Sequence, residues 1–109
     1  MVRLIKTRPN TVQFDEMLKA LGGYIKVAVD IRREILAGGG VMHADCEAVL
    51  LESGSKQEDI WGADWYPNEK KVDFKSLINI RPRQNNRDMD IQDQDLKQKV
   101  ERIVRKHLE

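Results

Sequence analysis

The sequence has a single cysteine and no long run of apolar residues. Because Cys46 is the only thiol in 109 residues, no internal disulfide can form, and a lone thiol is typical of a reducing compartment. No stretch approaches the roughly 18 apolar residues of a membrane-spanning helix. The N-terminus also lacks the apolar core of a signal peptide. We therefore predict a cytoplasmic protein without a membrane partner.

The sequence also has little net charge, +1, but that charge is unevenly divided. Residues 41–64 contain six acids and one lysine, which gives −5, so the rest of the chain carries +6. This division indicates either a bipolar surface or two separately solvated faces. The length predicts a single domain over residues 1–109.

The spacing of apolar residues predicts an α+β fold. We expect an antiparallel sheet of about four to five strands with two or three helices packed on one face. Alternating apolar residues predict strands over residues 2–5, 25–31, 35–37, 60–66 and 72–80. Helical spacing predicts helices over residues 11–21 and 93–108.

Two central segments are harder to assign. Residues 42–52 fit either a strand or a helix, and their alanine, glutamate and leucine content favours the helix. Gly38-Gly39-Gly40 is predicted to be a turn or a hinge. Trp61 and Trp65 are expected in the core, because the chain has only six aromatic residues. Other expected core residues are Leu18, Val27, Val29, Ile78, Ile80, Val100 and Ile103.

The segment 81–87 is the first candidate site. It holds three arginines, three side-chain amides and no acid, directly after an apolar alternation. Arginine forks match phosphate and carboxylate geometry, and amides can read base edges or ribose hydroxyls. The candidate residues for binding an anion or nucleic acid are Arg81, Arg83, Gln84, Asn86 and Arg87. Two alternatives are structural anchoring on the acids of 41–64 and recognition of an acidic protein.

A second candidate site is the run from His43 to Glu47. His43 and Glu47 share one face on a helix, and His43, Asp45 and Glu47 share one face on a strand. Either arrangement could supply metal ligands or an acid–base pair. The run lacks the second histidine of a His-Glu-x-x-His site. A purely structural histidine is the alternative, and Cys46 is expected to be a small buried residue.

Several motifs together resemble a family of short prokaryotic proteins of unknown function, common in cyanobacteria and other bacteria. They are His43-Ala44-Asp45 with Glu47, Asp59-Ile60-Trp61-Gly62, and the segment Leu77 to Arg87. The resemblance covers nearly the whole chain. It implies cytoplasmic single-domain proteins of this size, and it implies no reaction, cofactor or catalytic residue.

Three functional hypotheses follow from these patterns, and none of them requires a cofactor. The first is a non-catalytic module whose Arg81–Arg87 loop binds RNA or phosphate. The second is a small nuclease or phosphoester hydrolase, with His43 or Glu47 as base and Arg81 or Arg87 stabilising the phosphate charge. The third is a structural or protein-interaction domain that forms a homodimer through its divided charge.

Overall fold

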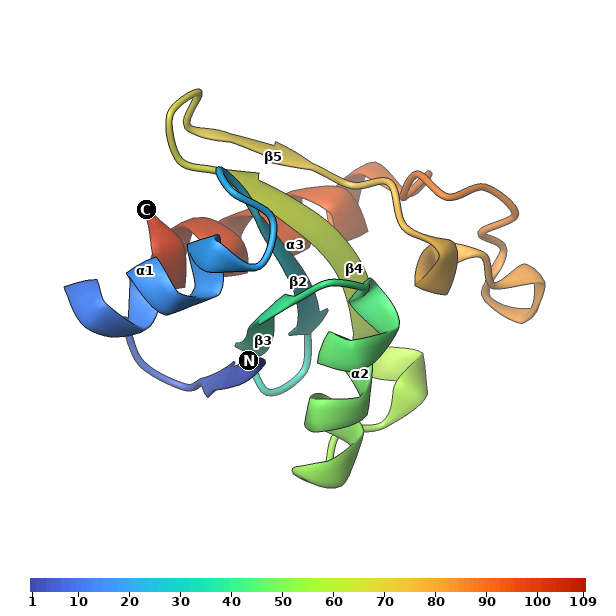
Figure 1. Cartoon of the computed structure of the whole chain (residues 1–109). Coiled ribbons are helices and arrows are strands. Elements are labelled where there is room, and N and C mark those ends of the chain that lie inside the picture. The colour runs from blue at the N-terminus through green and yellow to red at the C-terminus, as the bar shows by residue number, and fades with distance from the viewer.

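The computed structural model describes residues 1–109, which form one five-stranded antiparallel sheet with strand order β1-β3-β2-β4-β5 (Figure 1). The strands are β1 (Arg3–Ile5), β2 (Ile25–Asp30), β3 (Ile35–Gly40), β4 (Ile60–Tyr66) and β5 (Lys71–Asp73). The α-helices are α1 (Thr11–Lys19), α2 (His43–Glu52) and α3 (Gln94–Leu108). The predicted α+β fold and the predicted helix over residues 42–52 are confirmed. No helix has both the length and the apolar composition needed to cross a membrane.

Two of the three α-helices, α1 and α3, begin at a residue whose side chain caps the helix. The Asn10 side chain accepts a hydrogen bond from the Gln13 backbone N–H at 2.8 Å, and the Gln13 side chain accepts one from Asn10 N at 3.0 Å. Asp93 accepts from the backbone N–H groups of Asp95 and Leu96 at the start of α3. Such caps satisfy donors that a helix start leaves without intrahelical partners.

The larger core lies between the sheet and the helices α1 and α3. Alternate residues of β2 and β4 face this side, with Val27 opposite Ala63 and Val29 opposite Trp61. This core holds 15 buried residues, including Met17 from α1 and Ile103 from α3. In Figure 1, α3 passes behind the strands. Both tryptophans are buried in this core, as the sequence predicted.

A second, smaller core lies on the opposite face, under α2. It has six buried residues: Ala28, Ile35, Ala37, Cys46, Leu50 and Ile60. The expectation that the helices all pack on one face is therefore wrong in this detail. β2 is the middle strand, and its alternating side chains are buried on both faces, so a helix can cover each one.

The sequence suggested that the three consecutive glycines form a turn or a hinge. In the structure they are instead the last part of β3. A Cβ at Gly38 would lie 3.0 Å from Val27 Cγ1, and one at Gly39 would lie 2.9 Å from Met17 Cγ. Gly39 also has a φ of +95°, which favours glycine. The glycines therefore let α1 approach the strand closely.

The long strand predicted for residues 72–80 is also wrong, because β5 ends at Asp73 and Leu77–Asn79 form a 3₁₀ turn. At Gly62, the backbone N–H and carbonyl on the edge of β4 form hydrogen bonds with a side chain instead of with a neighbouring strand. Gly62 N donates to Asn79 Oδ1 at 2.7 Å, and Asn79 Nδ2 donates to Gly62 O at 3.0 Å. The Asn79 amide thus replaces a backbone peptide group. Ile80, predicted to be core, is 44% exposed as a result.

Candidate functional site

The candidate arginine segment lies between β5 and α3, in the part of the chain that projects at the right of Figure 1. Residues 81–86 form a tight bend. Asn86 N donates to Arg81 O at 3.0 Å, and Gln84 N donates to the same oxygen at 2.9 Å. Asn85 adopts the left-handed conformation, φ 58°, that asparagine tolerates.

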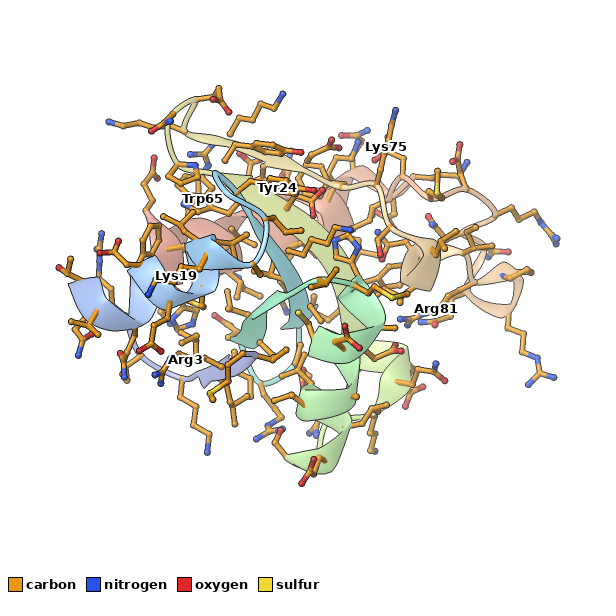
Figure 2. The ribbon with its side chains drawn as sticks, in the orientation of Figure 1. Arg3, Lys19, Tyr24, Trp65, Lys75 and Arg81 are labelled. Atoms are coloured by element: carbon orange, nitrogen blue, oxygen red, sulfur yellow. The ribbon has the colours of Figure 1, made fainter.

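Arg81 points into the protein, between its loop and α2 (Figure 2). Its Nε donates to Ile78 O at 2.9 Å, and its Nη1 donates to Gln57 O at 2.6 Å. Nη2 donates to the carbonyl of Ile60. The guanidinium carbon also lies 4.7 Å from the centroid of the Trp61 ring. These contacts engage all three nitrogens, so Arg81 fastens the loop to the residues around the start of β4.

Glu47 balances the charge of Arg81 beneath the loop. Its Oε2 lies 3.6 Å from Arg81 Nη2, and both side chains are largely buried. Burial lowers the pKa of Arg81, and the Glu47 carboxylate acts in the opposite direction. The sequence offered, as an alternative to ligand binding, that the acids of 41–64 anchor the arginines. The pair of Arg81 with Glu47 is such an anchor.

Asn86 is buried, and it organises the chain that follows the bend. Its Nδ2 donates to the carbonyls of Asn79, Asp88 and Asp90 at 2.7–3.0 Å. Its Oδ1 accepts from Gln92 N at 2.9 Å. Both polar atoms of this amide are therefore engaged within the protein. Asn86 therefore holds the loop in shape and does not face a ligand.

Arg83 and Arg87 are both exposed, and neither side chain makes a hydrogen bond or an ion pair within the protein. Gln84 is exposed as well, and its Nε2 donates to Glu58 O at 3.0 Å. Of the three arginines predicted to bind an anion, Arg83 and Arg87 are thus available at the surface, whereas Arg81 is engaged inside the protein.

A hollow of about 590 Å³ lies beside this loop. Its lining combines the Arg81–Glu47 pair and Arg83 with the aliphatic side chains of Leu77, Ile78, Ile80 and Pro82. Leu77 is 71% exposed and Ile80 44%, so both add apolar surface to the hollow. An exposed apolar surface beside a polar rim is typical of a binding surface.

His43 lies at the start of α2, next to a second hollow of about 360 Å³. Its Nε2 is 2.8 Å from Asp64 Oδ1 and 3.1 Å from Ala63 O. Because both neighbours are hydrogen-bond acceptors, Nε2 must carry a proton, and in a neutral imidazole Nδ1 keeps its lone pair. Lys26 and Lys75 also line this hollow, and neither forms an ion pair.

The other candidates near His43 have separate surroundings. Asp45 accepts a hydrogen bond from Met42 N at 3.3 Å, and Glu47 faces Arg81. No three His, Cys, Asp or Glu side chains come together in a way that could hold a metal ion. Cys46 is buried, and desolvation raises the pKa of its thiol to about 11. It is a small core residue, as predicted.

A family model described as a protein of unknown function, DUF5674, matches residues 3–107. The chain belongs to the DUF5674 family. No curated protein and no solved structure gave a significant match.

Sequence reasoning missed three residues around His43 in this DUF5674 chain: Asp64, Lys26 and Lys75. Asp64 was counted among the acids of 41–64 but was not paired with His43, from which it is 21 positions distant. Lys26 was recognised only as a polar position on a strand. Lys26 and Asp64 each alternate with buried residues on their strands, and this alternation was a usable signal. The two strands pair with Lys26 opposite Asp64.

Proposed function

We propose that this protein is a binding module that holds single-stranded RNA on the α2 face, through Arg83 and Arg87. The observation that supports it most is that Arg83, an exposed arginine without a partner, lines one hollow together with exposed aliphatic side chains. Arg87, which is exposed and unpartnered as well, follows in the same loop.

The loop is held rigidly from inside. Near the start of the loop, the Arg81 side chain donates hydrogen bonds to backbone carbonyls. Near its end, the Asn86 side chain donates to three other carbonyls. A loop fixed at both ends presents its exposed side chains with little loss of conformational entropy on binding. This supports a recognition role for the side chains that the loop does not use for itself.

The free cations favour an anionic partner. Arg83 and Arg87 lie in a segment without an acid, and Lys75 projects into solvent (Figure 2). Each can contact a phosphate oxygen, and the arginines can do so with two parallel hydrogen bonds. The two acids that follow in sequence form no ion pair with these arginines: Asp88 accepts a hydrogen bond from Asp90 N at 3.4 Å, and Asp90 pairs with Lys97 at 3.3 Å.

The exposed aliphatic side chains favour RNA over a free phosphate ion. Leu77, Ile80 and Pro82 offer an apolar surface, with which an inorganic anion gains nothing. An unpaired nucleobase offers a flat apolar face together with a phosphate on each side. Single-stranded RNA therefore matches both halves of the hollow, because its bases are free to leave the stack.

Fluorescence anisotropy of a labelled single-stranded RNA, at two salt concentrations, tests this proposal. We expect binding that weakens steeply with salt, because phosphate contacts release counterions. The double variant Arg83→Ala/Arg87→Ala should lose at least about tenfold in affinity, as expected when two phosphate contacts are removed.

A matched double variant, Arg8→Ala/Lys106→Ala, removes the same charge from the α1/α3 side of the molecule. Both of these side chains are exposed and form no ion pair. It should bind RNA within about twofold of the wild type. Equal losses in the two double variants would mean that only net charge matters, and no binding by the wild type would reject an RNA role. In that case, an acidic protein partner becomes the alternative.

A further inference from the structure

The His43–Asp64 pair has the arrangement of an oriented general base. Both side chains are about 10% exposed, and the carboxylate accepts the Nε2 proton at 2.8 Å. The buried polar atoms without a partner are Glu47 Oε2 and the two indole nitrogens. His43 Nδ1 also has no partner in the protein but is not among these buried atoms, so it is open to the hollow that His43 lines.

The surroundings of this base are suited to an anionic substrate. Lys26 and Lys75 line the hollow and have no acidic partner. Met42, the N-cap of α2, and the first two residues of the helix line it too, so the positive end of the helix dipole lies at the same space. A base that is held by a carboxylate and bordered by cations can deprotonate a hydroxyl next to a phosphate.

The second hollow adjoins the first, because Leu77 and Ile78 line both. An RNA strand held by Arg83 therefore leads across Leu77 toward His43. We propose that the His43–Asp64 hollow cleaves this RNA without a metal ion, with His43 as the general base and Asp64 as its positioning residue. The inference rests on the proposed RNA binding and adds a reaction to it.

The reaction is a transesterification within the RNA strand. His43 Nδ1 takes the proton of a ribose 2′-hydroxyl, and the 2′-oxygen forms a bond to the adjacent phosphorus. The bond from phosphorus to the 5′-oxygen of the next nucleotide breaks. The proton passes from His43, through water, to that leaving oxygen. The products are a 2′,3′-cyclic phosphate and a 5′-hydroxyl, so atoms and charge balance without another reactant.

Within this site, Lys26 and Lys75 stabilise the additional negative charge on the phosphate oxygens. Asp64 keeps the proton on Nε2 and so keeps the lone pair on Nδ1. Glu47 and Arg81 are less suited to these roles than the sequence suggested. They neutralise each other at 3.6 Å, and Arg81 is engaged by backbone carbonyls.

The test uses the full chain and a 5′-labelled oligoribonucleotide in buffer with EDTA. Cleavage is followed on a gel and binding by anisotropy, for the wild type and for His43→Gln and Asp64→Asn. His107→Gln is the control, because glutamine can still donate to Glu34 O, the partner of His107 at 2.9 Å. An oligonucleotide with a 2′-O-methyl group at every position serves as a substrate that cannot react.

We expect the wild type to form 2′,3′-cyclic ends in EDTA and to leave the 2′-O-methyl strand uncut. His43→Gln should cleave at least about 100-fold more slowly, within the range for loss of a general base. Asp64→Asn should lower kcat and leave RNA affinity within about twofold, whereas a purely structural change would also weaken binding. His107→Gln should behave as the wild type.

Binding without cleavage by the wild type would overturn this inference and leave the proposed function intact. Cleavage that is equally fast in His43→Gln purified in the same way would also overturn it, and would point to a contaminating nuclease. Absence of both binding and cleavage would reject the two proposals together. A comparison of 2′-O-methyl and ordinary strands needs no variant, so misfolding of His43→Gln cannot hide the result.

Discussion

The two faces of the sheet differ in how they use their side chains. On the α1/α3 face, 15 buried residues form one continuous core. On the α2 face, the core has only six residues, and a buried His–Asp pair and an anchored arginine each border a hollow.

This difference indicates that the α1/α3 face mainly stabilises the fold and that the α2 face mainly carries the candidate binding site. Apolar burial contributes in proportion to area, so the α1/α3 face supplies most of the folding free energy. On the α2 face, several buried positions hold polar groups. Burying such a group is tolerated only when it is hydrogen-bonded or ion-paired. Residues that keep a polar surface in one shape are typical of a functional site set on a rigid scaffold.

Replacing one isoleucine on each face gives the largest expected contrast. Ile103 is fully buried against the sheet, whereas Ile80 is 44% exposed in the first hollow. Ile103→Ala should lower the free energy of unfolding by about 2–5 kcal/mol, since it leaves a cavity. Ile80→Ala should lower it by less than about 1 kcal/mol. Urea denaturation measures both, and similar losses would contradict the division between the faces.

Removing the Asn79 amide should have the next largest effect. Asn79→Ala leaves the buried N–H and carbonyl of Gly62 without partners and removes one hydrogen bond each from the carbonyls of Phe74 and Met89. We expect a loss of about 2–3 kcal/mol from orphaned polar groups. Hydrogen exchange should become faster in the segment 74–92 and stay slow in α3. Uniformly faster exchange would show that the segment is not separately anchored.

Replacing Arg81 by lysine should give a smaller loss of stability and a clear loss of RNA binding. One ammonium group cannot reach the carbonyls of Gln57, Ile78 and Ile60 together, nor can it stack on Trp61 in the same way. We expect a loss of about 1–2 kcal/mol from the broken hydrogen bonds. If Arg81→Lys kept full affinity for RNA, the anchoring of the loop would have no part in recognition.

The smallest effect concerns Cys46 in the core of the α2 face. Burial raises the pKa of its thiol to about 11, so at pH 8 only about 0.1% is thiolate. Alkylation of the folded protein by iodoacetamide should be at least about 100-fold slower than that of a free cysteine, whose pKa is near 8.5. Fast alkylation under native conditions would show that α2 detaches readily from the sheet.

The same raised pKa predicts how stability changes at high pH. Because the folded thiol ionises at a higher pH than the unfolded one, its contribution to stability is complete below the unfolded pKa. That contribution decreases as the pH rises toward about 11. Cys46→Ala should remove this part of the alkaline decrease, which thermal melts between pH 8 and pH 10.5 can measure.

Elements whose pattern is repeated along the sequence could be predicted well. α3 shows helical spacing and an Asp93 cap, and β2 and β4 alternate regularly, so their type and limits follow from local rules. The failures occurred where a distant partner decides the structure. Residues 77–80 alternate like a strand, yet the Asn79 side chain takes the place of strand pairing at Gly62.

The candidate site was predicted in part, for the same reason. The sequence identified the Arg81–Arg87 segment and His43, because unusual composition is visible in one segment. It did not separate Arg81, which faces Glu47, from the exposed Arg83, since spacing alone does not tell which way a bent loop turns. The Asp64 partner of His43 depends on where α2 meets β4, a contact that no local pattern encodes.

An NMR titration with single-stranded RNA tests the division between the two faces most directly, through the amide signals of the whole chain. We predict shifts confined to residues 42–47 and 75–87 and to the strand positions under them, with α1 and α3 unchanged. Adding salt should reverse these shifts, because the contacts are to phosphate. Shifts centred on α1 or α3, or none at saturating RNA, would contradict the account of the α2 face as the functional one.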